Sequence, residues 1–588
     1  MNTSDRLIRK TFIGVWIISG MGVLLSIACV LIDAVFTGQF LGPDAVTAAG
    51  LVQPVTMIVN ILGALMGPGL GVVCTRYMGM ARKDMVNKVF SIGMIGMLAL
   101  TGTGCLTLYF ASGGIANALG ARTNNPEIIE MVYEYLKGFS LAVMPMCFTI
   151  GLSGLMIIDN DKGRGVASMF ATLLSDVLFD ALNVTVFHGG MFGMAIATAM
   201  SQAVGFLVVC THFIRKDRIL KFSFREPDAK HLKDIVLCGI PSCVSMGSSA
   251  IRVMIFNAFL LTIGSSMTVA GFSAANSLFS IVQAISLGFY LTSTTVSSFL
   301  YGEEDRNGIV KTLRTATVLS TLILLGISGI LALGSNLAAR GFLDSESPEA
   351  LEYASTFIRV MAASSFLNIS AFPQSGVYQG TRRNVINYIF VALREGILPI
   401  ACALGLGLAF GVTGFEIGLI AAGALTFLSC YIIPAIVNRK FSLKTSDLVL
   451  LPEDFGARKE DLFEASMNTM EEVVAVSAEV TEFVKSRGRD MKVAYNTGLF
   501  IEEMAGNSIA HGNKRSKSVN VEIRVICHPD KMTIRIRDDG AMFDPLEWLE
   551  KNNPDNPSEG LGIRIIAGLA KDVRYIPSLG LNNLLIQL

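Results

Sequence analysis

Long runs of apolar residues, separated by short polar loops, extend to about residue 438, and beyond that point charged residues are frequent. A helix that crosses a bilayer needs about 20 mostly apolar residues, and about twelve runs reach that length. The pattern predicts a polytopic α-helical membrane domain over residues 1–440, a linker over 441–464 and a soluble domain over 465–588. The runs lie near residues 12–38, 51–75, 89–111, 134–158, 165–187, 191–213, 235–262, 268–298, 313–335, 354–377, 386–409 and 414–437.

Composition supports this division. Only 16% of the residues are charged, against about 25% in ordinary soluble domains. Lysine plus arginine and aspartate plus glutamate number 47 each, and this balance gives no indication of a nucleic-acid partner. The ten cysteines form no C-x-x-C motif, which argues against a disulfide framework or a zinc site. The N-terminal MNTSDRLIRK leads directly into the first run, so we expect an uncleaved helix.

Basic residues cluster in every second loop, and this bias predicts the orientation in the membrane. The alternate loops, such as GQFLGPDAV and FHGGMFG, contain few lysines and arginines. We therefore predict a multi-pass protein of the cell (inner) membrane with both termini in the cytoplasm, where ATP is available. The basic residues are Arg6, Arg9, Lys10, Arg76, Arg82, Lys83, Arg215, Lys216, Arg218, Lys221, Arg225, Arg382, Arg383, Arg439 and Lys440.

An internal repeat divides the membrane domain. Residues 40–79 and 262–302 each contain a glycine-started loop, a helix start rich in small residues, a long apolar helix and an aromatic–glycine exit. Both copies run from outside to inside, so the repeat is parallel. The repeat predicts two six-helix lobes, over about residues 10–215 and 232–440, around a central cavity, which is a transporter architecture.

Three aspartates lie inside the apolar runs. Asp33 is in the first run, and Asp176 and Asp180 are in the fifth, where their spacing of four places them on one helix face. A charge at the bilayer centre costs about 2.5–3.5 kcal/mol and marks a functional candidate. Two such carboxylates need a proton, a sodium ion or a substrate cation as partner. Alternatively, the three aspartates lie at helix ends in the headgroup zone.

The segment from about residue 10 to 440 resembles the MATE family of multidrug and toxic compound exporters. The resemblance rests on DAVFTGQFLGPDAVTAAG, MGPGLGVVCTRYMG, GMFGMAIATAMSQ and GIPSCVSMGSSAIRVMIFNAFLL. It implies twelve helices in two lobes and the export of organic cations or other amphiphiles in exchange for sodium ions or protons. The alternative within the same superfamily is a flippase for lipid-linked oligosaccharides, which the compact loops and the acidic fifth run disfavour.

The MATE resemblance also implies a cation site in the first lobe. Its positions are Asp33, Asp176, Asp180 and Thr198. Asp176 departs from the usual asparagine, and the added carboxylate favours proton coupling or a different cation stoichiometry. The corresponding positions of the second lobe are Asn257 and Arg394–Glu395, and no second ion site is assigned.

The soluble domain alternates helical and strand-like segments, which is typical of an α/β sandwich. We expect helices over residues 470–488 and 492–512, and two strands within 519–540 joined by a turn at His528–Pro529–Asp530. A polar loop over 541–560, a helix over 560–573 and a last strand over 582–588 follow.

Three motifs of the soluble domain carry chemistry, although each is weak alone. Glu503 and Asn507 lie one helical turn apart on a face that continues to His511, and such a pair suits a hydrated magnesium ion. Asp538–Asp539–Gly540 ends a strand, where a carboxylate can accept a hydrogen bond from an adenine amino group. Gly560 and Gly562 open a helix, whose free amides suit a phosphate.

The order of these motifs resembles the GHKL ATPase domain, and IEEMAGNSIAHG and RDDGAMFDP are most similar to the anti-sigma-factor serine kinase branch. The resemblance implies ATP and magnesium as cofactors. Met542 departs from the usual glycine or proline, so nucleotide affinity is expected to differ. A histidine autokinase is not expected, because no histidine lies in a separate dimerisation helix pair. The implied roles are magnesium ligand for Asn507, general base for Glu503, adenine contacts for Asp538 and Gly540, and phosphate contacts for Gly560 and Gly562.

Two functions follow from these modules. The first is a cation-coupled antiporter of small amphiphilic or drug-like compounds, regulated by its cytoplasmic ATP-binding domain. The second is a membrane sensor whose tail phosphorylates serine or threonine on a protein partner, as the retained Glu503 suggests. ATP-driven pumping ranks last, because the chain has no G-x-x-x-x-G-K-[ST] loop.

Overall fold

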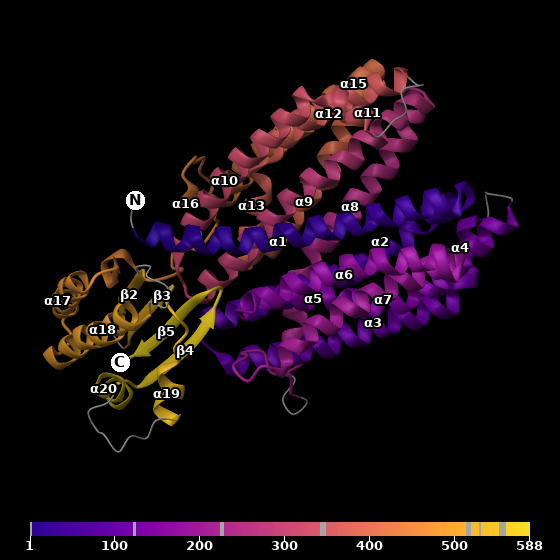
Figure 1. Ribbon diagram of the computed structural model, residues 1–588. Coiled ribbons are helices and arrows are strands. Elements are labelled where there is room, and N and C mark those ends of the chain that lie inside the picture. Colours follow the sequence, from indigo (N-terminus) through magenta and orange to yellow (C-terminus); the bar gives the residue numbers. More distant parts are fainter. Residues whose placement is uncertain are drawn as a thin grey trace.

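The computed structural model describes residues 3–120, 125–223, 228–341, 348–512, 519–528, 531–551 and 560–588. Arg225 of the basic loop after the sixth run, Pro529 and Asp530 of the predicted turn, and residues 552–559 of the predicted polar loop lie outside these ranges. The described chain forms two helical lobes and one α/β domain (Figure 1).

The first lobe contains the first six membrane crossings. The helices coincide with the predicted apolar runs, and most extend beyond them at one or both ends. They are α1 (Thr3–Phe36) with the π-helix η1 (Thr37–Leu41), α2 (Pro43–Gly79), α3 (Lys83–Gly120), α4 (Pro126–Phe139), η2 (Ser140–Ala142), α5 (Val143–Ile158), α6 (Lys162–Leu182) with the π-helix η3 (Asn183–Phe187), α7 (Gly190–Cys210) and η4 (Thr211–Ile214).

The second lobe repeats this arrangement. It consists of α8 (Lys230–Ile263), α9 (Ser266–Gly302), α10 (Arg306–Leu333), α11 (Ser335–Arg340), α12 (Pro348–Asn368), α13 (Ala371–Gly380), α14 (Asn384–Ala392), the π-helix η5 (Leu393–Ile397) and α15 (Leu398–Asn438).

Ten of the described helical segments are long and apolar enough to cross a membrane. One of them, Asn384–Asn438, is two crossings, because Gly411 with a φ of 63° breaks the helix inside α15. The broken pair α12–α13 supplies one further crossing. The arrangement therefore agrees with the twelve crossings and two lobes that the sequence predicts.

The lobes meet at the ends that adjoin the C-terminal domain and lie apart at the opposite ends, near α4 and α11 (Figure 1). At the meeting point α2 and α9 touch backbone to backbone. A Cβ atom at Gly79 would lie 2.0 Å from the Phe299 carbonyl oxygen, and one at Gly302 would lie 2.0 Å from that of Arg76. Small residues allow this close approach of membrane helices.

The C-terminal domain is a five-stranded antiparallel sheet in the order β1-β2-β3-β5-β4, with its helices on one face. A capping box between Thr469 and Glu472 starts its first long helix. The elements are α16 (Thr445–Leu448), η6 (Lys459–Asp461), β1 (Leu462–Met467), α17 (Met470–Ser486), α18 (Met491–His511), β2 (Val521–Cys527), β3 (Met532–Asp538), α19 (Pro545–Lys551), α20 (Leu561–Leu569), β4 (Asp572–Ser578) and β5 (Leu581–Gln587).

Two strands differ from the sequence expectations. The first half of β1 lies within the predicted linker, and β4 begins at the end of the expected helix and continues through residues where no element was expected. Both are edge strands of the sheet. β1 is short and β4 contains Pro577 and charged residues, which are common on edge strands and weaken the strand pattern.

The two faces of the sheet have different neighbours. Ile534 and Ile536 of β3 face the helices and join a core with Val480 and Phe500. The opposite face belongs to the core of the membrane domain, through Ile576 of β4 and Leu585 of β5 among other residues. The sheet therefore lies between its own helices and the membrane domain (Figure 1).

Candidate functional site

The structure brings Asp33 of α1 together with Asp176 and Asp180 of α6. One carboxylate oxygen from each lies within 4.8 Å of the others. Asp176 and Asp180 are buried, and four oxygens of the cluster have no hydrogen-bond partner within the described residues: Oδ1 of Asp33, Oδ2 of Asp176 and both of Asp180. Buried polar groups are normally paired, so this cluster has the acceptor capacity for a cation or for protons.

The structure does not bring Thr198 into contact with these carboxylates. Its hydroxyl donates to the Met194 carbonyl of its own helix at 3.2 Å. Ser201, three residues further along α7, donates to Asp176 Oδ1 at 2.7 Å instead. The sequence reasoning missed Ser201, although its spacing from Thr198 places both on one helix face.

Both aspartate-bearing helices continue into π-helices: η1 follows Asp33, and η3 follows Asp180. Asn183, the first residue of η3, accepts a hydrogen bond from the Gly189 amide and so fixes the start of α7. π-Helical turns are rare and frequent at functional sites, because they re-aim side chains within a helix.

In the C-terminal domain, Glu503 and the start of α20 come together. A Cβ atom at Gly562 would lie 2.0 Å from Glu503 Oε2, and one at Gly560, whose φ is 65°, would lie 2.2 Å from the Trp548 ring. Asn507 lies on α18, one turn after Glu503. The predicted carboxylate of Glu503 and the two glycines thus meet at the N-terminus of α20, and the predicted amide lies one turn further along α18.

Asp538 is anchored at the end of β3 by three donors. Ser508 donates to Oδ2 at 2.9 Å, Asn582 to Oδ1 at 2.7 Å and the Gly540 amide to Oδ1 at 2.9 Å. Burial raises the pKa of Asp538 above its ordinary value, although these hydrogen bonds oppose the rise. Ser508 and Asn582 were not predicted from the sequence. Met542 is half exposed beside this position.

Arginines on the face of the sheet that packs against the membrane domain contact the second lobe just after the end of α9. Arg537 contacts Glu303 at 2.9 Å and Asp305 at 3.0 Å, and all three side chains are buried. Burial alone would raise the pKa of Asp305, but the charges of Arg524 and Arg537 lower it to about 2. Asp305 and Arg537 therefore remain an ionised pair across the physiological pH range.

Arg535 joins both lobes. Its Nη1 donates to the carbonyl of Gly79, the last residue of α2, at 2.7 Å and lies 2.7 Å from Glu303 Oε1. Lys10 and Lys83 of the first lobe contact Asp539 at 2.5 Å and Asp544 at 3.2 Å. The C-terminal domain therefore spans the point where the two lobes meet.

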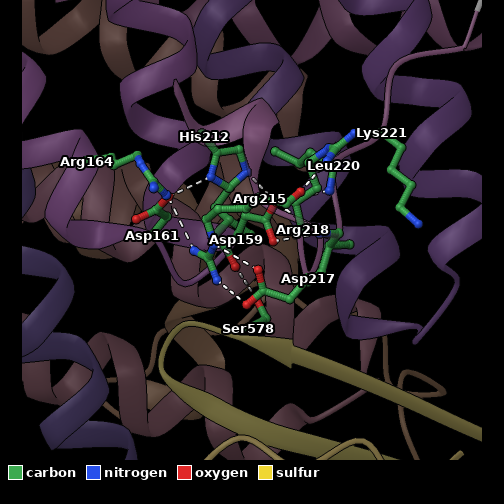
Figure 2. A network of polar contacts seen from close by, with 12 residues as sticks. Asp159, Asp161, Arg164, His212, Arg215, Asp217, Arg218, Leu220, Lys221 and Ser578 are labelled. Atoms are coloured by element: carbon green, nitrogen blue, oxygen red, sulfur yellow. Dashed lines mark hydrogen bonds and ion pairs between the residues drawn. The ribbon is translucent and has the colours of Figure 1, made fainter. Parts of the chain in front are cut away.

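The turn between β4 and β5 contacts a surface of the first lobe that is held together by a network of polar contacts (Figure 2). Ser578 donates to the Ile158 carbonyl at 3.0 Å. Beside it, the fully buried His212 ring contacts Asp159 at 2.9 Å and Asp161 at 2.8 Å. Arg164 also pairs with Asp161, at 2.5 Å. This network ties the α5–α6 connection to the segment after α7.

Two family models match the chain. One described as MatE matches residues 19–182 and 241–404. One described as a histidine kinase-like ATPase domain matches residues 467–587.

The curated relatives cover the membrane part. The multidrug export protein MepA of Staphylococcus aureus (strain NCTC 8325 / PS 47) is 24% identical over 436 residues, which is 73% of this chain and 94% of MepA. MepA of Staphylococcus saprophyticus is 24% identical over 438 residues, with the same shares of 73% and 94%.

Solved structures share the membrane fold. An outward-facing multidrug resistance MATE family transporter superposes with a TM-score of 0.68 at 22% identity, covering 72% of this chain and 94% of that one. A mutant of the Vibrio cholerae MATE transporter VcmN superposes with a TM-score of 0.69 at 15% identity, covering 74% of this chain and 98% of that one.

Proposed function

This chain belongs to the MatE family, and we propose that it exports small amphiphilic compounds across the cell membrane in exchange for sodium ions or protons. The proposal rests chiefly on the contact of the Asp33, Asp176 and Asp180 carboxylates inside the first lobe. Three acidic groups this close in a low-dielectric interior cannot all be ionised without a cation. The MepA relatives, which are multidrug export proteins, support the substrate class.

The C-terminal histidine kinase-like ATPase domain binds ATP with magnesium in this proposal. Asp538 would accept the adenine amino group, and Asn507 would hold the magnesium ion beside Glu503. The amides at the start of α20 would face the phosphates. ATP is available in the cytoplasm, so the C-terminal domain lies in the cytoplasm in this proposal. The start of α1 lies on the same side of the membrane, because Lys10 contacts Asp539.

Nucleotide regulates transport through the contact between the domain and both lobes. Alternating access requires the two lobe ends to separate on the side where they now meet. The domain opposes this separation, because Arg535 binds Gly79 of the first lobe and Glu303 of the second. Asp539, which is bound to Lys10, directly follows the predicted adenine ligand, so nucleotide binding would alter the contact with the first lobe.

Proteoliposomes containing the full chain test this function. We expect uptake of a fluorescent cationic dye to require a sodium or proton gradient. We also expect Mg-ATP on the side of the C-terminal domain to change the initial rate at a constant gradient. Uptake without any gradient would contradict the coupling, and an unchanged rate with nucleotide bound would contradict the regulation.

A second candidate is a serine or threonine kinase that acts on a separate protein. It is favoured by Glu503, whose carboxylate lies against the start of α20, where the phosphates would bind. Membranes containing the full chain, incubated with labelled ATP and cell lysate, should then label a protein. No labelling, or labelling that survives Glu503→Ala, would exclude this activity.

A further inference from the structure

The second lobe contains a cluster of three charged side chains. Glu395 lies in η5 between two arginines: Arg252 of α8, at 3.1 Å from Oε2, and Arg394 of η5, at 2.9 Å from Oε1. Arg252 also donates to the Glu395 carbonyl at 3.0 Å. Both carboxylate oxygens of Glu395 are therefore occupied by guanidinium groups.

The cluster lies deep in the membrane. α14 starts directly after Arg382 and Arg383, and Arg394 follows the start of α14 at Asn384 by ten residues, which is about 15 Å of helix. This is half of a hydrocarbon core about 30 Å thick. Arg394 is 3% and Glu395 7% exposed, so both side chains are packed inside the lobe.

The charges of the cluster do not balance. Two guanidinium groups face one carboxylate, and among the described residues Glu395 is the only acidic side chain paired with either arginine. Arginine does not lose its proton in proteins, so the excess charge persists. Arg394 Nη1 is buried without a hydrogen-bond partner in the described chain. Its guanidinium otherwise rests 3.9 Å from the centre of the Phe372 ring.

The first lobe has the opposite polarity at the related position. The fifth crossing of the first lobe carries Asp176 and Asp180 and ends in the π-helix η3, whereas that of the second lobe carries Arg394 at the π-helix η5. The first lobe thus presents unpartnered acceptors, and the second presents an unpartnered cationic donor. The unpaired polar atoms of the two halves of the repeat are therefore opposite in charge.

We propose that the second lobe binds a small univalent anionic group against Arg394, either a halide ion from solution or the carboxylate of an exported compound. Such a group would neutralise the excess charge and accept the free N–H of Arg394 in a charge-assisted hydrogen bond. With the acidic cluster of the first lobe, it would allow the protein to handle compounds that carry both a cationic and an anionic group. The halide form does not depend on the export function, whereas the carboxylate form rests on it.

Thermal unfolding of the purified full chain tests the site directly. Chloride is titrated against gluconate at constant ionic strength, and we expect a saturable rise in Tm for the wild type and none for Arg394→Gln. Glu395→Gln removes the competing carboxylate, so the chloride midpoint should fall by about tenfold. If the two arginines only stabilise the packing of η5 against α8, Glu395→Gln destabilises the protein without any gain in chloride affinity. Arg359→Gln on α12, whose arginine contacts Ser335 and Ser355, should behave as wild type.

Transport of a matched dye pair distinguishes the two sources of the anionic group. Uptake of a xanthene dye with a free carboxylate is compared with uptake of its ethyl ester in proteoliposomes. The measured quantity is the uptake rate of the free carboxylate dye divided by that of the ester. A fall of this ratio in Arg394→Gln, with partial recovery in Arg394→Lys, indicates the carboxylate of the exported compound. A chloride effect with an unchanged ratio indicates the halide. If neither experiment shows an effect, the proposal is wrong. The chloride experiment can be decided from the wild type and Glu395→Gln alone, so it remains decisive even if Arg394→Gln folds poorly. Uptake of the ester would still report the proposed export function.

Discussion

Lys10, near the start of α1, forms an ion pair of 2.5 Å with Asp539, the neighbour of the predicted adenine ligand Asp538. The same helix carries Asp33 close to its other end, at the acidic cluster. One continuous helix therefore contacts the surroundings of both candidate sites. Any coupling along it must be reciprocal, so that nucleotide alters cation affinity and cation alters nucleotide affinity by the same factor.

Lys10→Gln should weaken the effect of nucleotide on transport. The lysine is mostly exposed, so the pair contributes about 0.2–1 kcal/mol, and the response to Mg-ATP should fall by less than about fivefold. The measurement is the ratio of uptake rates with and without nucleotide. Arg6→Gln, about one turn earlier on α1, is the control and should leave this ratio unchanged.

Arg535→Gln should favour separation of the lobes at the α2–α9 contact. The change removes one partner of a buried charge pair and a bond to the Gly79 carbonyl, at a cost of about 2 kcal/mol or more. Spin labels at positions 82 and 304, which follow α2 and α9, would report a new population at longer distance. Arg574→Gln, which breaks a pair within β4, should not change the distance distribution. An identical distribution for Arg535→Gln would contradict the bridging role.

Asp33→Asn should reduce gradient-driven uptake at least about tenfold, because it removes one carboxylate of a site that must bind and release a cation. Asp44→Asn, at the exposed start of α2, should retain uptake. Asp176→Asn introduces the asparagine that the family resemblance implies at this position, and we expect it to change the dependence of uptake on sodium and pH rather than abolish uptake. Asp33→Asn with the wild-type rate would exclude the proposed ion site.

Gly562→Ala should weaken nucleotide binding, because the new methyl carbon would lie 2.0 Å from Glu503 Oε2 and would displace the Glu503 side chain at the start of α20. Gly568→Ala is the matched control on the same helix, since a Cβ atom there meets nothing within 4 Å. It should bind nucleotide normally and gain up to about 1 kcal/mol from helix propensity. Binding is measured on the full chain with a fluorescent ATP analogue.

Nucleotide affinity should fall as the pH is lowered through the pKa of Asp538. Burial raises the pKa of Asp538 above its ordinary value, and the carboxylate is a stronger acceptor for the adenine amino group than the protonated acid, which retains only part of the acceptor capacity. A raised folded-state pKa means that this group stabilises the fold at low pH and loses that contribution as pH rises through the pKa. The loss of affinity therefore cannot come from unfolding at Asp538. Asp538→Asn should bind weakly with little pH dependence.

The sequence predicted the membrane crossings because a 20-residue apolar run has few other interpretations. The aspartate cluster followed from the spacing of Asp176 and Asp180, with Asp33 added by the family resemblance. The family resemblance implied Thr198, and only the packing of α7 against α6 shows that Ser201 is the residue that donates to Asp176.

The contact between the domain and the lobes could not be foreseen. Arg535 and Arg537 alternate with Ile534 and Ile536 along β3, and this is also the pattern of a strand with one solvent-exposed face. Their partners Glu303 and Asp305 lie more than two hundred residues earlier, in a short loop of ordinary polar composition. Only the folded chain shows that the row of arginines is covered.

The strand order determines when, during synthesis of the chain, the C-terminal sheet can form. β4 and β5 are synthesised after all the membrane helices, yet β5 lies inside the sheet between β3 and β4. The surface that carries Ile576, Ser578 and Leu585 therefore does not exist while the ribosome is still making the lobes. The helices can insert and pack before the domain closes over them, so in the newly made membrane domain the contacts of the sheet with both lobes are not yet formed.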